Sequence, residues 1–145
     1  MGSGRAITQD QLDRLFTAAL EAAIGRVEKD GHFHPLVFEL RPGGTIQAVA
    51  VLETGVTDTS RGPADRMGQL LQPRAREGRI EASAIVRMRQ QERALEVRLR
   101  APNYSADIGV PFTLETSGLV KRQRRVVLGA FSAEPAHNDV FGDEA

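Results

Sequence analysis

The 145-residue sequence contains no cysteine and no tryptophan, and aromatic residues make up only 5% of it. Without cysteine the chain forms no disulfide, thiolate nucleophile or cysteine-ligated zinc site, which is compatible with a reducing cytoplasm. Few aromatic residues argue against a sheet that stacks nucleic-acid bases. No apolar run approaches the roughly 18–20 residues of a membrane span, and the N-terminus lacks an apolar signal core. We therefore expect a cytoplasmic protein that does not associate with a membrane.

The net charge is zero, but the charges are distributed unevenly along the chain. Residues 1–73 carry a net charge of −2, residues 74–125 carry +6 and residues 126–145 carry −4. A basic middle segment between acidic ends is consistent with a binding surface or with charge pairing inside the molecule. A dedicated DNA-binding domain is usually clearly basic, and this chain is not.

The length suits a single domain over 1–145, with flexible tails over about 1–6 and 135–145. A first helix is predicted after Thr8, which forms a capping box with Gln11. Gly31 is the expected C-terminal stop. The apolar residues of this segment recur at steps of three and four, which gives one continuous stripe: Leu12, Leu15, Phe16, Ala19, Leu20, Ala23, Ile24 and Val27.

Two strands are predicted next, one opening at Pro35 and one over 45–53, joined by a turn at residues 41–44. A second helix is expected over about 63–72, with an irregular continuation to Glu77, because Pro73 removes a hydrogen bond inside it. Four strands then follow over roughly 80–90, 93–101, 106–116 and 119–132. Pro111 indicates that its strand is an edge strand or carries a bulge.

The four-residue turn at 90–93 predicts the register of the first two of these strands. If Arg89 lies opposite Ala94, then Val86 faces Val97, and Arg87 faces Glu96 on the solvent-exposed side. The resulting fold class is α+β, with the order α-β-β-α-β-β-β-β. It is a two-layer domain in which both helices cover one face of an antiparallel sheet of about six strands.

This layout resembles small, uncharacterised bacterial single-domain proteins. The residues that carry the resemblance are Gly31–Pro35 after the first helix, Gly78–Ile80 before the late strands, and the arginine-rich segment before Val126. The chain departs from that pattern at Pro73. That family has no settled activity, so the resemblance implies none of the familiar enzyme classes.

His32 and His34 are the candidate metal ligands, because residues i and i+2 of an extended segment point to the same side. A third ligand is not specified, and His137, Asp58 and Asp107 are candidates by residue type alone. The simpler interpretation is a pair of surface histidines. We expect no cofactor.

Arg87, Arg89, Arg98 and Arg100 are the candidate ligand-binding residues, since alternation places them on one sheet face. Guanidinium groups match phosphate geometry, so this face is a candidate surface for a nucleic acid or a small anionic ligand. Interleaved glutamates support a second interpretation, a solvated face with cross-strand ion pairs.

No catalytic motif is present: the sequence has no G-x-S-x-G elbow, no P-loop and no dinucleotide fingerprint. An open sheet leaves edges that must be paired, covered or charged. We therefore expect a non-enzymatic interaction module that forms a homo-oligomer, with a homodimer as the leading case and a protein partner as another. Anion or nucleic-acid binding at the arginines is the alternative, and metal binding at the histidines is the third.

Overall fold

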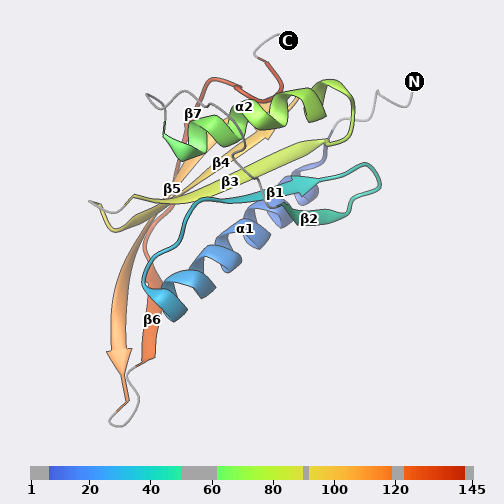
Figure 1. Cartoon of the computed structure of the whole chain (residues 1–145). Helices are drawn as coiled ribbons and strands as arrows, with labels where there is room; N and C mark the ends of the chain where they lie inside the picture. The colour runs from blue at the N-terminus through green and yellow to red at the C-terminus, as the bar shows by residue number, and fades with distance from the viewer. Residues whose placement is uncertain (1–6, 50–61, 90–91, 119–122, 143–145) are drawn as a thin grey trace.

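A computed structural model of the chain describes residues 7–49, 62–89, 92–118 and 123–142. Within these residues two helices and seven strands form an α+β fold (Figure 1). The elements are α1 (Gln9–Asp30), β1 (Leu36–Leu40), β2 (Ile46–Val49), α2 (Pro63–Arg76), β3 (Ala82–Arg89), β4 (Ala94–Ala101), β5 (Tyr104–Ser117), β6 (Gln123–Leu128) and β7 (Ser132–Pro135). The predicted fold class and element order are confirmed, with a seventh strand in the sheet.

Local sequence signals explain the ends of α1. The Thr8 side chain accepts a hydrogen bond from the Gln11 backbone N–H at 3.1 Å, and the Gln11 side chain accepts one from Thr8 N–H at 3.0 Å. This capping box satisfies two backbone donors that the helix itself leaves unpaired. At the other end, Gly31 adopts a φ of +83°, which glycine adopts without steric cost.

The sheet is antiparallel throughout, in the order β2-β1-β3-β4-β5-β6, and β7 also pairs with β5. The β3–β4 register is the predicted one: Arg89 lies opposite Ala94, Val86 opposite Val97, and Arg87 opposite Glu96. Turn length and the alternation of apolar residues therefore determine this hairpin.

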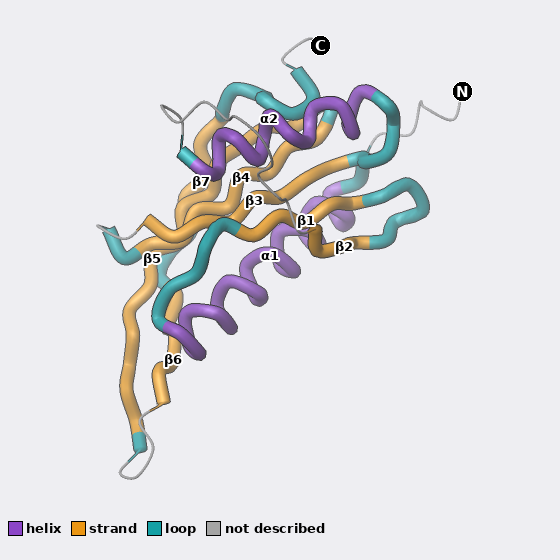
Figure 2. The backbone as a smooth tube through the Cα atoms, viewed as in Figure 1, coloured by secondary structure: helices purple, strands orange, loops and turns teal. Residues whose placement is uncertain are grey.

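The placement of the helices differs from the prediction, because α1 and α2 cover opposite faces of the sheet (Figures 1 and 2). One apolar cluster joins α1 to alternate residues such as Ala84, Val86 and Val97. A second, smaller cluster joins α2 to the other face through Val37, Ile80, Ile85 and Val140. The α2 stripe is short, so its periodicity could not show which face it covers. The domain therefore has three layers rather than two.

Pro111 lies in β5, which is neither an edge strand nor unpaired. β4 pairs with one side of β5, while β7 pairs with its residues 106–109 and β6 with its residues 112–117 on the other. Phe112 N–H donates to Arg93 O, and Pro111 O accepts from Gly129 N–H at 2.7 Å. The missing N–H of Pro111 therefore faces the gap between the ends of β7 and β6, where the ladder needs no donor.

Two segments depart from simple periodicity. Helix α2 continues through Pro73 to Arg76. Pro73 has no N–H to donate to the Gln69 carbonyl, but both residues are exposed, so water can reach that carbonyl. Residues 136–142, expected in a tail, form an irregular segment docked on the α2 side, where Asn138 and Val140 are buried. The remainder of the two expected tails, 1–6 and 143–145, lies outside the described residues. No helix among the described residues is long and apolar enough to cross a membrane.

Candidate functional site

The four predicted arginines share the sheet face that α2 covers. Arg87 and Arg89 belong to β3, and Arg98 and Arg100 belong to β4. Ile85 lies on the same side of β3 as Arg87 and Arg89, because residues two apart in a strand share a face. Since Ile85 packs in the α2 cluster, the arginines lie on the α2 side of the sheet. The prediction that they share one face is therefore confirmed, whereas the expectation that this face is open to solvent is wrong.

Glu96 is the centre of the charged cluster on this face and is only 2% exposed. It accepts hydrogen bonds from Arg87 Nε at 2.7 Å, from Arg98 Nε at 2.8 Å and from the Arg89 guanidinium. Burial alone would raise the pKa of Glu96, but the hydrogen bonds from these three arginines outweigh it and lower the pKa to about 2. Glu96 therefore stays ionised and holds three guanidinium groups side by side.

Arg98 connects this cluster to α2. Its Nη1 atom donates to Asp65 Oδ1 at 2.6 Å, while its Nε atom donates to Glu96. Burial opposes the charged form of Arg98, but the hydrogen bonds that it donates to Asp65 and Glu96 raise its pKa above the ordinary value. Asp65 lies in the first turn of α2, so this ion pair ties the start of the helix to the middle of β4.

Arg100 is the most enclosed of the four arginines, at 3% exposure. Its Nε atom donates to Asp139 Oδ1 at 2.7 Å, and its Nη2 atom lies 2.8 Å from Asp107 Oδ1. Its Nη1 atom donates to the carbonyl oxygens of Leu99 and Ala106. Because two carboxylates and two carbonyls surround it, Arg100 has little capacity left for an external anion.

Glu39 on β1 is a second buried carboxylate, and no motif in the sequence points to it. It is fully buried, and Arg74 of α2 donates to both of its oxygens, at 2.6 and 2.8 Å. Arg41 adds a longer contact of 3.3 Å. Alternation places Glu39 on the same face as Val37, but its partner comes from a helix whose position the sequence did not determine.

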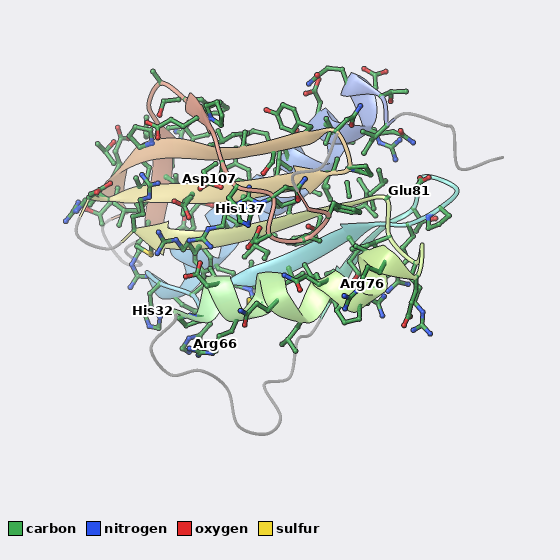
Figure 3. All side chains as sticks on the ribbon, turned by 90° about the horizontal axis from the view of Figure 1, so that it is seen from above. His32, Arg66, Arg76, Glu81, Asp107 and His137 are labelled. Carbon is green, nitrogen blue, oxygen red and sulfur yellow. The ribbon has the colours of Figure 1, made fainter. Side chains whose placement is uncertain are left out.

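The residues 136–142 complete the enclosure of this face. Asn138 Nδ2 donates to Ala101 O at 2.8 Å, and Gln72 Nε2 of α2 donates to Asp139 O at 2.6 Å. Val140 packs into the α2 cluster. This segment therefore connects α2 to β4 through hydrogen bonds to both. Figure 3, viewed from above, shows His137 and Asp107 close together over the sheet.

Two clefts of about 450 Å³ each open on this face, and Asp65 and Arg98 line both. The first lies between α2, the sheet and the C-terminal segment, and is strongly polar. Its lining residues are Asp65, Gln69, Gln72, Arg98, Arg100, Asp107, Ala136, His137 and Asp139. The second lies between the start of α2 and the α1–β1 connection, and mixes apolar residues with two arginines. Its lining residues are Phe33, His34, Pro35, Gly62, Pro63, Ala64, Asp65, Arg87, Met88 and Arg98.

His32 and His34 lie in the connection between α1 and β1, and both are exposed. Among the described residues, no group of three histidine or carboxylate side chains is placed to hold a metal ion. Figure 3 shows His32 well separated from His137 and Asp107, two of the residues considered as a third ligand. The third, Asp58, lies outside the described residues, so metal binding by the pair stays a prediction.

A separate surface lies where β6 ends and the chain turns toward β7, next to the arm that β5 and β6 form beyond β4 (Figure 1). The described chain has four exposed large apolar side chains, and three of them lie within residues 127–131: Val127, Leu128 and Phe131. Phe131 is 51% exposed and packs edge-on against Phe16 of α1, with ring centroids 5.7 Å apart. We call these three residues the arm patch.

The free edge of β6 is partly covered by α1. Val126 N–H donates to Glu28 Oε2 at 2.9 Å, and Arg124 Nη1 donates to Lys29 O at 3.0 Å. A side-chain carboxylate on an edge N–H blocks a position that another strand would need. The position of Val126 on this edge is therefore not open to an added strand.

Comparison of the chain with protein-family models, with curated proteins and with solved structures finds no match. The resemblance to small bacterial single-domain proteins stays a prediction, and function must be argued from the geometry alone.

Proposed function

We propose that this protein is a non-enzymatic interaction module that associates with a second copy of itself through the arm patch. The observation that carries this proposal is the concentration of exposed large apolar side chains at residues 127–131; among the described residues, only Leu70 is a further one. Exposed large apolar side chains that are grouped in one part of a folded protein commonly mark an interaction site. The absence of cysteine favours a reducing compartment, and we propose a cytoplasmic, bacterial protein.

A second copy is a suitable partner for three reasons. The net charge is zero, so two copies do not repel each other at long range. The arm carries Glu115 opposite Arg125, so a two-fold axis can place Glu115 of one copy near the partner's Arg125. Val127 lies on the arm face that points away from α1, while Leu128 alternates onto the other face. The arm therefore presents an exposed apolar side chain on each of its faces to a second copy.

Light scattering coupled to gel filtration tests this proposal. We expect the wild-type protein to have twice the 15.8 kDa mass of one chain at micromolar concentrations. Phe131→Ser and Leu128→Ser should shift it to the monomer, because each removes apolar area from the interface. Leu70→Ser is the matched control, since Leu70 is 43% exposed but lies on α2.

Two results would contradict self-association. One is a wild-type protein that stays at 15.8 kDa throughout the micromolar range. The other is a Leu70→Ser variant that dissociates as readily as Phe131→Ser, since the arm patch would then not be the interface.

The arginine face gives less support to nucleic-acid binding than the sequence suggested. Arg87, Arg89, Arg98 and Arg100 all donate to carboxylates within the domain. A nucleic acid would have to compete with these internal partners for each guanidinium group.

A further inference from the structure

We propose that the cleft between the start of α2 and the α1–β1 connection binds a small monovalent carboxylate that has a compact apolar body. This site is separate from the arm patch and does not depend on self-association. Its volume of about 450 Å³ lies in the range of small-molecule sites.

The anion-binding part of the cleft consists of Arg87 and Arg98, which both line it. Arg87 donates through Nε and Nη2 to Glu96, and Arg98 donates through Nε to Glu96 and through Nη1 to Asp65. Within the described residues, neither Arg87 Nη1 nor Arg98 Nη2 forms a hydrogen bond. Each guanidinium therefore keeps one terminal nitrogen for an oxyanion.

The buried Glu96 makes this pair of arginines a prepared site. One carboxylate serves three guanidinium groups, so the positive charge around it exceeds its own negative charge. Arg89 has a further contact with Glu92 and Arg98 has one with Asp65, whereas the carboxylate partner of Arg87 within the described part of the chain is Glu96 alone. Arg87 is therefore the least neutralised of the three, and its side chain is 37% exposed. Groups already held in place lose less freedom on binding a ligand.

The remainder of the lining determines the class of ligand. Asp65 is the only carboxylate among the described residues that line this cleft, and its negative charge opposes a dianion such as phosphate more than a monoanion. Several of the other lining residues are apolar and suit a hydrocarbon body: Phe33, Pro35, Pro63 and Met88. These two properties together favour an apolar carboxylate over an inorganic anion.

Titration of the full chain with benzoate, followed by amide NMR shifts, tests the site. We expect saturable shifts at Phe33, Ala64 and Asp65, much weaker shifts with the neutral analogue benzamide, and weaker binding of acetate and phosphate than of benzoate. Arg87→Gln should weaken benzoate binding about tenfold, the loss of one charge-assisted hydrogen bond. Arg89→Gln is the matched control, because Arg89 also binds Glu96 but does not line the cleft.

Circular dichroism must first show that the variants fold like the wild type. Arg87→Lys is a second variant, which keeps the positive charge but lacks the planar guanidinium that donates two parallel hydrogen bonds. Arg87→Lys should bind benzoate more tightly than Arg87→Gln. Equal shifts with benzoate and benzamide would overturn the proposal, as would equal losses in Arg87→Gln and Arg89→Gln. Phosphate binding tighter than benzoate would overturn the assigned ligand class. Failure of self-association would leave these measurements unaffected.

Discussion

Three arginine side chains converge on Glu96, and this one residue controls the charge balance of the α2-side face. Its pKa of about 2 lies below the ordinary value of 4.5, so ionisation of Glu96 is favoured by the folded state. A depressed carboxyl pKa contributes stability above the unfolded pKa and loses it as the pH falls through the folded one. The stabilisation by Glu96 is therefore lost as the pH falls from 4.5 to 2, and it contributes about 3 kcal/mol to the free energy of unfolding at neutral pH.

Replacement of Glu96 by Gln tests this balance. The change keeps the shape but leaves three guanidinium groups without their shared carboxylate, so we expect a loss of about 3–5 kcal/mol in the free energy of unfolding. Urea unfolding at neutral pH measures that loss. Between pH 4.5 and 2, the wild-type protein should lose more stability than Glu96→Gln. Glu92→Gln is the control, because Glu92 is exposed and its ion pair is worth about 0–1 kcal/mol. Equal losses in the two variants would contradict the central role of Glu96.

At the scale of the elements, the docked residues 136–142 hold α2 to the sheet. Asn138 is 4% exposed, and its side chain donates to Ala101 O and accepts from Phe141 N–H at 2.9 Å. Both partners are backbone groups, and Ala101 is fully buried. A buried backbone group that loses its partner pays the full cost of desolvation.

Asn138→Ala should therefore lower the free energy of unfolding by about 1–3 kcal/mol. Amide hydrogen exchange should also become faster in α2, because the segment that fastens it is loosened. Asn103→Ala, in the exposed turn between β4 and β5, provides a comparison that should change stability little. If the two alanine variants unfold at the same urea concentration, the docked segment has no stabilising role.

The elements also show how far the sequence could predict this structure. The α1 capping box, the β3–β4 register and the shared face of the arginines follow from local spacing, because turn length and alternation are properties of neighbouring residues. The position of α2 does not, since its apolar stripe fits either face. Val37, Val49 and Ile85 are apolar residues on the strand faces opposite α1, and they indicate that this side of the sheet is also covered. The partners of Glu39 and Arg100 come from distant elements, and no local pattern specifies them.

At the scale of the whole molecule, α1 and α2 enclose the sheet from both sides while the β5–β6 arm extends from the body (Figure 2). Three of the four exposed large apolar side chains of the described residues lie within residues 127–131, at the end of β6 and directly after it. If two copies associate through the arm patch, folding and association are coupled.

The melting temperature should therefore rise with protein concentration in the wild type, because mass action favours the associated folded state. In Phe131→Ser it should be independent of concentration. Differential scanning calorimetry over a hundredfold concentration range measures both. A wild-type melting temperature that does not change with concentration would contradict the coupling.

The close approach of α2 and residues 136–142 also limits how this chain can diversify. A Cβ atom at Gly68 would overlap the Asp139 carboxylate, which Arg100 holds in place. No side chain can therefore be introduced at position 68 while Asp139 keeps this position. In descendants of this sequence, positions 68 and 139 should consequently change together, and a glycine at 68 paired with an acidic residue at 139 would indicate a retained docked segment.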